Sequence, residues 1–408
     1  STPDHSTVFR GAAIKSLDQR YFIVFGACLT QFFIIGLLFS YGLFFKAFET
    51  EFGWSRTLLS SCISLAFLVM GILAFFAGGL NDRYGPRVVL SVAGTLCGVG
   101  YALLSQVTEP WQLFVLFGMF IGVGMATHDV VTLSTIARWF HQRRGIMTGV
   151  VKVGTAVGQI TVPPVAAYLI VLFGWRPALI ILGLTAVVML LIAASLLRSP
   201  PAPEGAAAQA ASSGLSFEEA RSSSLLWMLC AIQFSFFPTL TTVPLHIVVH
   251  AMDLGMTPAT AAILLSVIGA SSVVGRLTFG GLADRIGGKR ALLLCFIPLL
   301  FSLAAFLLIQ TPWMLFAAVG LYGFAHGGLF TAVSPTVAEY FGLKAHGAIF
   351  GLILLFGTIG GSLGPILAGW AFDVSGSYTM AFSSLAGLLV FGLLLVLRLP
   401  AAPASGPS

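Results

Sequence analysis

The stretch "SSVVGRLTFGGLADRIGGKR", residues 271–290, holds the two features that decide the fold of this chain. An arginine, Arg276, stands inside an apolar run, and a charged turn that contains Asp284 ends this run eight residues later. The turn has an earlier copy, because "GGLNDRYGPR" begins at Gly78 and "GGLADRIGGKR" begins at Gly280, and 280 minus 78 is 202. A motif that recurs at a long offset indicates an internal duplication.

Pairs of identical residues elsewhere in the chain are separated by the same 202 residues. They are Cys28 and Cys230, Gln31 and Gln233, Gly149 and Gly351, Gly158 and Gly360, and Pro163 and Pro365. One offset at this many places is hard to obtain by chance. The chain is therefore expected to consist of two copies of one unit in the same order, with a ligand site between them.

The composition places this duplicated chain in a membrane. Of its 408 residues, 58% are hydrophobic and 8% are charged, whereas about a quarter of the residues in a soluble domain are charged. A helix needs roughly 20 mostly apolar residues to cross a bilayer, and twelve such runs occur. The runs cover residues 21–48, 57–80, 86–106, 111–137, 144–173, 176–197, 223–250, 258–283, 289–309, 312–338, 346–372 and 377–398.

The expected fold class is therefore an all-α membrane protein with twelve transmembrane helices in two pseudo-symmetric six-helix halves. The N-terminal six-helix bundle covers residues 1–198, and the C-terminal bundle covers residues 223–408. Residues 199–222, which are rich in Pro, Ala and Ser, are expected to form a flexible cytoplasmic linker.

Positive charges orient the predicted spans. If the N-terminus is cytoplasmic, 15 Arg and Lys residues fall on the inner side, whereas Arg56 and Arg176 fall on the outer connections and Lys46 near the outer edge of the first span. This asymmetry follows the positive-inside rule and predicts cytoplasmic N- and C-termini, in the inner membrane if the source is bacterial. The excess positive charge, +6 in all, is then explained by the cations that orient the spans in the membrane. No nucleic acid is therefore expected as a partner.

The motifs of enzymes and metal proteins are absent from the sequence. The five cysteines lie inside apolar runs without metal-ligand spacing. Glycine-rich stretches such as "GTIGGSLGP", residues 357–365, lack the Lys-Ser/Thr ending of a phosphate-binding loop. We therefore expect no catalytic residues, no metal ion and no cofactor.

The two charged turns resemble the loop signature of the major facilitator superfamily, in which Gly, three residues, Asp-Arg, one residue and Gly precede basic residues. Pro86 takes one basic position in the first copy, and the second copy keeps the basic character. The resemblance covers all twelve spans. It implies the major facilitator fold and transport by alternating access, driven by a proton or substrate gradient.

The charges of the two turns are candidates for gating, because such clusters can form charge-assisted bonds in one state and lose them in another. The candidates are Asp82, Arg83, Arg87, Asp284, Arg285 and Arg290. The alternative is a tight turn with charges that only set the topology.

Three further stretches resemble the monocarboxylate transporter family, near the oxalate/formate exchangers, and indicate a bacterial-type homologue. They are "FSYGLFFKAFETEFGWSR", "WFHQRRGIMTGVVKVG" and "LLSVIGASSVVGRLTFGGLADR". The third contains the family's span-eight arginine at Arg276, whereas Ser272 stands where the family carries an aspartate. Span eleven of this chain contains no counterpart of the lysine that the oxalate exchangers carry there, although Lys152 could substitute from the other half. A small monoanion such as lactate or pyruvate, the family's typical substrates, therefore fits better than a dianion.

Arg276 is the first candidate for holding a substrate carboxylate. It lies roughly 12 Å from the inner end of its span, where an arginine costs on the order of 3 kcal/mol to insert. Its planar guanidinium matches a carboxylate with two parallel hydrogen bonds, and Ser272, one turn away, leaves room for a ligand. The alternative is a structural arginine that is bonded to backbone carbonyls or paired with Asp129.

The fourth and fifth spans carry further ionisable residues at mid-depth. His128 and Asp129, about 100° apart around one helix, are a candidate proton relay. Asp129 is the only acidic residue well inside a span. Lys152 lies on a polar stripe with Thr148 and Thr155, and it could bind an anion or neutralise Asp129. The alternatives are an ion-paired structural aspartate and a histidine satisfied by a neighbouring hydroxyl.

Further candidates for a substrate cavity lie on other spans. They are Gln31, Gln233, Tyr41, His326, Phe237, Phe330 and Phe356. The polar side chains could hydrogen-bond a substrate, and the phenylalanines could form an apolar wall. The alternatives are glutamines that join helices and phenylalanines that belong to the core.

These predictions favour a monomeric secondary transporter that couples proton symport to a small monocarboxylate of the lactate and pyruvate class. A proton would make the translocated pair neutral, which avoids about 2.3 kcal/mol per charge per 100 mV of membrane potential. Three alternatives stay open: exchange of oxalate- or formate-type anions, a non-transporting nutrient sensor on the same fold, and multidrug export.

Overall fold

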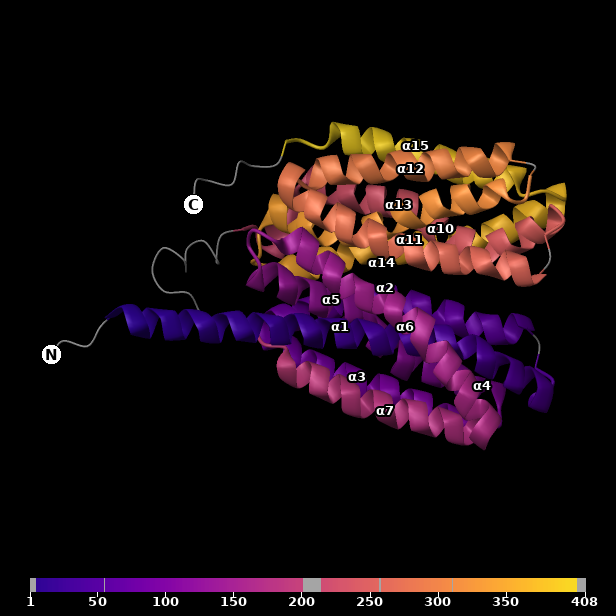
Figure 1. Ribbon diagram of the computed structural model, residues 1–408, viewed down its shortest axis with the longest axis horizontal. Helices are drawn as coiled ribbons and strands as arrows, with labels where there is room; N and C mark the ends of the chain where they lie inside the picture. Colours follow the sequence, from indigo (N-terminus) through magenta and orange to yellow (C-terminus); the bar gives the residue numbers. More distant parts are fainter. Residues whose placement is uncertain (1–4, 55, 201–213, 257, 310, 402–408) are drawn as a thin grey trace.

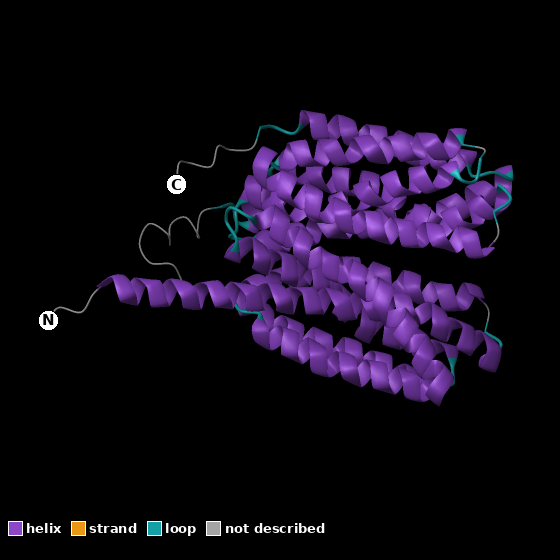
Figure 2. Ribbon diagram, in the orientation of Figure 1, coloured by secondary structure: helices purple, strands orange, loops and turns teal. Residues whose placement is uncertain are grey.

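The computed structural model describes residues 5–54, 56–200, 214–256, 258–309 and 311–401, and these residues are almost entirely helical (Figure 2). Twelve helical segments in this part of the chain are long and apolar enough to cross a membrane, as predicted. The first six consist of α1 (His5–Phe52), α2 (Arg56–Tyr84), α3 (Pro86–Leu103), α4 (Pro110–Val115) continued by η2 (Leu116–Ile121) and α5 (Gly122–Trp139), α6 (Arg144–Phe173) and α7 (Trp175–Leu196). The last six are α10 (Ser224–Asp253), α11 (Pro258–Ile286), α12 (Gly288–Leu308), α13 (Met314–Phe341), α14 (His346–Ser375) and α15 (Thr379–Arg398).

The helices form two bundles that lie side by side (Figure 1). Helices α1 to α7, indigo to magenta, make the first bundle, and α10 to α15, orange to yellow, make the second. The duplication extends to the helix bounds, because α2 and α11 begin and end 202 residues apart (258 minus 56 and 286 minus 84). The same holds for α6 and α14 (346 minus 144 and 375 minus 173). The predicted fold of two pseudo-symmetric six-helix halves is therefore confirmed.

The two halves meet through two equivalent helix pairs. Helix α2 packs against α14, and α11 packs against α6. A Cβ atom added to Gly78 would lie 2.0 Å from the carbonyl oxygen of Gly347, and one added to Gly145 would lie 2.0 Å from that of Gly280. Small residues let helix backbones approach this closely, so these glycines explain how the halves come into contact.

Both charged turns contain a glycine with a left-handed backbone. Gly85, between α2 and α3, has a φ of 82°, and Gly287, between α11 and α12, has a φ of 85°. Glycine adopts this conformation without a steric penalty, so each helix pair reverses direction within one residue. Helix α1 begins and α15 ends at the same end of the molecule (Figure 1). Lys289 Nζ donates to the Leu399 carbonyl at 2.5 Å and ties the second turn to this end, which we call the termini end.

One predicted linker segment has more structure than expected. Residues 217–222, within the expected flexible linker, form the short helix α9 (Phe217–Ser222). Ser216 and Glu219 form a capping box that satisfies the first amides of this helix. The ring of Phe217 packs on Phe75 of α2, with 5.1 Å between ring centroids. Residues 201–213 of the linker lie outside the described residues.

Candidate functional site

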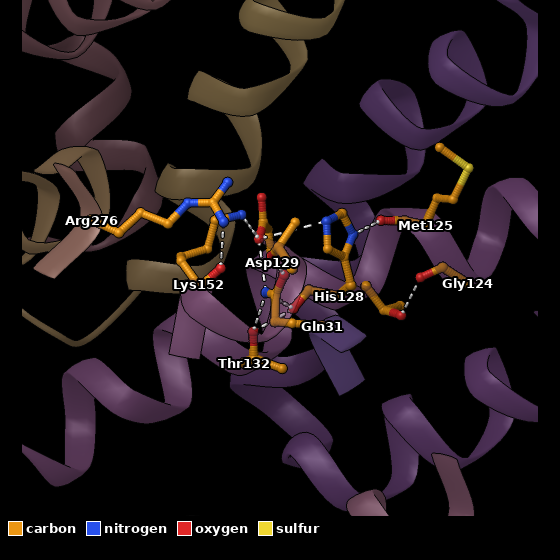
Figure 3. Close-up of polar contacts among 10 residues, drawn as sticks. Gln31, Gly124, Met125, His128, Asp129, Thr132, Lys152 and Arg276 are labelled. Carbon is orange, nitrogen blue, oxygen red and sulfur yellow. Dashed lines mark hydrogen bonds and ion pairs between the residues drawn. The ribbon is translucent and has the colours of Figure 1, made fainter. Parts of the chain in front are cut away.

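Four helices from both halves meet at a group of buried polar side chains (Figure 3). At its centre, Asp129 Oδ1 of α5 accepts hydrogen bonds from Lys152 Nζ of α6 at 2.7 Å and from Gln31 Nε2 of α1 at 2.9 Å. No member of the group is more than 9% exposed. We call it the central polar cluster, and its members are Gln31, His128, Asp129, Thr132, Lys152, Thr155 and Arg276.

Arg276 reaches the cluster from α11 in the second half. Its Nη1 donates to the backbone carbonyl of Lys152 at 2.8 Å, which matches the alternative of a backbone-bonded arginine. Its Nε is buried and finds no hydrogen-bond partner among the described residues. The Lys152 ammonium lies near the guanidinium (Figure 3). One edge of Arg276 is therefore structural, and another is free to bind a ligand.

The charges of the central polar cluster do not balance. Lys152 and Arg276 contribute two positive charges and Asp129 one negative charge, so the net charge is +1 when the imidazole of His128 is neutral. Within the part of the chain that the structure describes, Asp129 is the only acidic residue deep inside a span. Burial of a charge is costly unless a partner of opposite sign offsets it. The cluster is therefore suited to bind a monoanion.

His128 lies closer to Asp129 than the helical spacing predicted. Its Nε2 is 3.6 Å from Asp129 Oδ1, although the two Cα–Cβ bonds point about 100° apart around the helix. The imidazole is long enough to turn back toward its neighbour, and its Nδ1 contacts the Met125 carbonyl.

Among the described residues, no group of three or more His, Cys, Asp or Glu side chains could hold a metal ion.

The two symmetry-related glutamines have different surroundings. Gln31 donates to Asp129 and accepts a hydrogen bond at 2.8 Å from Thr155 Oγ1. The Oε1 atom of Gln233 is buried and has no hydrogen-bond partner among the described residues. Ser272 donates to the Gly269 carbonyl of its own helix at 2.8 Å. Of Gln31, Gln233 and Ser272, only Gln31 lies within the central polar cluster.

An aromatic group from the second half borders the cluster. The ring centroid of Phe330 is 5.1 Å from Lys152 Nζ, and the ring of Phe237 packs on Phe330 at 5.6 Å. The ring of His326 lies 4.9 Å from Phe330, and its buried Nδ1 has no hydrogen-bond partner in the described part of the chain. The structure thus brings together Phe330, Phe237 and His326, as an apolar wall with one polar atom.

Two predicted cavity residues lie elsewhere. Tyr41 is ten residues beyond Gln31 on α1, roughly 15 Å along the helix. It packs on Phe117 and donates to the Leu59 carbonyl at 3.3 Å. Phe356 packs on Trp227, which is 45% exposed, and no contact joins Phe356 to the central polar cluster among the described residues. Helical periodicity does not distinguish these positions from cavity positions, because both faces of a membrane helix are apolar.

The aspartates of the two charged turns connect the halves. Asp82 accepts hydrogen bonds from the backbone amides of Gly347 and Ala348 at 3.3 and 3.2 Å, in the first turn of α14. We call this the Asp82 contact. Asp284 accepts hydrogen bonds from the amides of Gly145 and Ile146 at 2.6 and 2.9 Å, in the first turn of α6. We call this the Asp284 contact.

Asp284 thus repeats the arrangement of Asp82 at the equivalent position of the other half. Helix N-termini present free amides and a partial positive charge, so both carboxylates are well placed.

The arginines predicted to gate do not bond these aspartates. Arg83 lies over the ring of Tyr84, and Arg87 donates to the Ser195 carbonyl at 2.6 Å. Arg285 and Arg290 are exposed and form no ion pair among the described residues. The partner that the sequence analysis missed is Arg138, at the end of α5, which forms an ion pair with Asp82. Its position at the termini end of a span was the signal available.

The comparisons with known proteins agree with this architecture. Residues 27–253 and 247–408 match the Major Facilitator Superfamily. The chain is 29% identical to "Monocarboxylate transporter 13" of Rattus norvegicus, over 93% of this chain and 89% of the relative. It is 28% identical to "Monocarboxylate transporter 11" of Homo sapiens, over 91% and 81%. The solved structure of the Escherichia coli fucose:proton symporter FucP superposes with a TM-score of 0.73 at 14% identity, over 93% of this chain and 98% of that chain.

A second solved structure supports the same fold. The proton:xylose symporter XylE superposes with a TM-score of 0.72 at 16% identity, over 94% of this chain and 97% of that chain. The family match covers both halves of the chain. The twelve membrane helices are divided equally between the halves, and each half contains one copy of the charged turn. This chain therefore belongs to the Major Facilitator Superfamily of membrane transporters.

Proposed function

We propose that this chain is a secondary active transporter that carries a small monocarboxylate together with a proton, acting as a monomer by alternating access. The observation that carries the proposal is the central polar cluster, in which two buried cations face one buried carboxylate. The names of the two monocarboxylate transporters to which the chain is similar support the substrate class.

The anion would bind between the Arg276 guanidinium, whose Nε has no hydrogen-bond partner among the described residues, and the Lys152 ammonium (Figure 3). A carboxylate in this position would accept charge-assisted hydrogen bonds from both cations. The ring of Phe330, 5.1 Å from Lys152 Nζ, would contact the apolar part of a small acid. One bound monoanion would bring the net charge of the cluster from +1 to zero.

Proton coupling would follow from competition for Lys152. The anion and the Asp129 carboxylate need the same ammonium, so a bound anion weakens the ion pair that keeps Asp129 ionised. Asp129 then takes a proton more readily, and its protonation returns the loaded cluster to +1. The empty and the loaded carrier would have the same charge, so the cycle moves no net charge against the membrane potential.

The Asp82 and Asp284 contacts would hold the halves together at the termini end. The Arg and Lys residues concentrated at the predicted inner loops support a cytoplasmic position for this end. With this end held closed, the site would be reached from the outside. Reorientation requires both contacts to break while α2 separates from α14 and α11 from α6.

Anion exchange is the second candidate function. The ion pair between Lys152 and Asp129 favours it, because a carboxylate with a fixed cationic partner needs no proton. An exchanger would bind one anion on each side in turn, and it would not respond to a proton gradient.

Uptake of labelled lactate into proteoliposomes tests the proposal. We expect an inward proton gradient to stimulate uptake in the wild type, and Arg276→Ala to abolish this uptake. Arg398→Ala is the matched control, since Arg398 is exposed at the end of α15. Uptake that ignores the gradient and rises with internal anion would favour exchange. Undiminished uptake by Arg276→Ala would contradict binding at Arg276.

A further inference from the structure

Both polar atoms of the Gln31 side-chain amide form hydrogen bonds with other members of the central polar cluster. Its Nε2 faces three acceptors, which are Asp129 Oδ1 at 2.9 Å, Thr132 Oγ1 at 3.0 Å and the His128 carbonyl at 3.1 Å. Its Oε1 accepts a hydrogen bond from Thr155 Oγ1 at 2.8 Å. The side chain is fully buried. A substrate could therefore bond Gln31 only by displacing one of these partners.

The orientation of this amide follows from the chemistry of its neighbours. An ionised carboxylate and a backbone carbonyl only accept hydrogen bonds, so the nitrogen of Gln31 must face Asp129. The hydroxyl of Thr132 donates to the His128 carbonyl and therefore accepts from Gln31. The hydroxyl of Thr155 is free to donate to Oε1. By donating to Oε1, Thr155 thus fixes the orientation in which Gln31 Nε2 donates to Asp129.

Gln31 and Lys152 donate to the same oxygen of Asp129. A hydrogen bond donated to a carboxylate favours its ionised form. The two donors differ in one respect, because Lys152 has a charge that a bound anion attracts and Gln31 has none. Gln31 therefore stays on Asp129 when an anion recruits Lys152.

The symmetry mate shows what happens without these partners. At the offset of 202 residues, Gln233 corresponds to Gln31, Gly357 to Thr155, and Thr331 to Asp129. Gly357 has no hydroxyl to donate, and Gln233 Oε1 is buried without a hydrogen-bond partner among the described residues. The same residue type is thus held on a carboxylate in one half and left with a free acceptor in the other.

We infer that Gln31, oriented by Thr155, is a positioning residue that holds the Asp129 carboxylate and sets how readily it takes a proton, and that it is not a ligand of the substrate. This inference rests on the proposed proton-coupled transport. Of the two glutamines, it leaves Gln233, whose Oε1 has no hydrogen-bond partner among the described residues, free to contact a substrate.

The test compares the pH dependence of lactate uptake with the KM for lactate in proteoliposomes. In Gln31→Met, the pH of half-maximal proton-driven uptake is expected to rise by about one unit, with little change in KM. Loss of the donor destabilises the ionised carboxylate, so Asp129 is protonated at higher pH. Thr155→Val should shift the profile in the same direction by less, and Thr155→Ser, which keeps the hydroxyl, should restore the wild-type profile.

Gln233→Met is the matched control, because it removes the same amide from the equivalent position. We expect it to raise KM several-fold without moving the pH profile. A Gln31→Met protein with a raised KM and an unmoved pH profile would overturn the inference and make Gln31 a ligand. If Gln31→Met does not elute as a folded monomer, Thr155→Val decides by the same criterion.

A second measurement separates this inference from the proposed function. In a Lys152→Met background, the protonated-carboxyl infrared band that Asp129→Asn removes can be titrated without any substrate. Adding Gln31→Met should raise the midpoint of this band by about one pH unit. If wild-type uptake ignores the proton gradient but this midpoint shifts, the proposed symport fails and the positioning role stands. An unmoved midpoint overturns the positioning role itself.

Discussion

The Asp82 and Asp284 contacts occupy equivalent positions in the two halves and differ in one partner. Asp284 accepts backbone amides at 2.6 and 2.9 Å and has no ion pair among the described residues. Asp82 accepts amides at 3.3 and 3.2 Å and forms an ion pair with Arg138. Position 340, which is 138 plus 202, holds Tyr340, whose hydroxyl donates to the Pro400 carbonyl at 2.7 Å.

The difference shows that a cation within one half competes with the contact between halves. Arg138 and Asp82 belong to the same half, so their ion pair persists when the halves separate. Because the Asp82 carboxylate is paired with Arg138, it attracts the backbone amides in the first turn of α14 less strongly. The Asp284 contact is therefore expected to be the stronger of the two bonds between the halves.

The largest effect is expected from Gly145→Ala. Its Cβ would lie 2.0 Å from the Gly280 carbonyl oxygen, a backbone atom that cannot move aside. Overpacking at the upper end of its range, about 3 kcal/mol, would lower lactate uptake roughly a hundredfold. Gly347→Ala is the matched variant, because its Cβ would lie 2.7 Å from both Asp82 Oδ1 and the Gly78 carbonyl oxygen, a less severe overlap that should cost less. Equal losses in the two variants would contradict the asymmetry.

Replacing each aspartate by asparagine should show which of the two contacts is the stronger. A hydrogen bond to a charged group contributes about 1.5–3 kcal/mol, so Asp284→Asn should raise the open fraction of the termini end roughly tenfold. Spin labels at the exposed positions Arg143 and Arg285 would report this opening as longer distances.

Asp82→Asn should raise the open fraction of the termini end less than Asp284→Asn does, as measured with labels at the exposed positions Arg83 and Lys344. A larger opening for Asp82→Asn would reverse the order proposed for the two contacts.

Arg138→Tyr would make the first half resemble the second at this position. With the competing cation removed, Asp82 can turn its full charge toward α14, and the open fraction should fall. An ion pair of about 1 kcal/mol corresponds to roughly a fivefold change. The labels at positions 83 and 344 measure it, and the labels at 143 and 285 should report the same fall, because reorientation breaks both contacts together. An increase in the open fraction would mean that Arg138 orients Asp82 instead of competing for it.

The smallest effects are expected from Arg87→Ala and Lys289→Ala. Arg87 donates to the Ser195 carbonyl and Lys289 to the Leu399 carbonyl, each within its own half. Surface charges of this kind contribute about 0–1 kcal/mol, so thermal stability should fall slightly and lactate uptake by less than about twofold. A large loss of uptake in Arg87→Ala alone would restore the gating role predicted from the sequence.

From the amino-acid pattern alone we could predict the twelve spans, the duplication and the charged residues that lie inside the membrane. These properties depend on local hydropathy and on a constant offset, which need no knowledge of packing. Arg276, Lys152 and Asp129 stand out for the same reason, because ionisable residues are rare inside apolar runs.

Which of these groups come into contact depends on how the helices pack. Gln31 and Asp129 are 98 residues apart in the chain, Arg276 and Lys152 are 124 apart, and Asp82 and Ala348 are 266 apart. The glutamine is hydrogen-bonded to a carboxylate in one half and has an unpartnered acceptor in the other, although Cys28 and Phe32 near Gln31 recur as Cys230 and Phe234 near Gln233. The physical reason is that a buried polar side chain takes its role from the hydrogen-bond partners that packing brings to it, and those partners come from other helices.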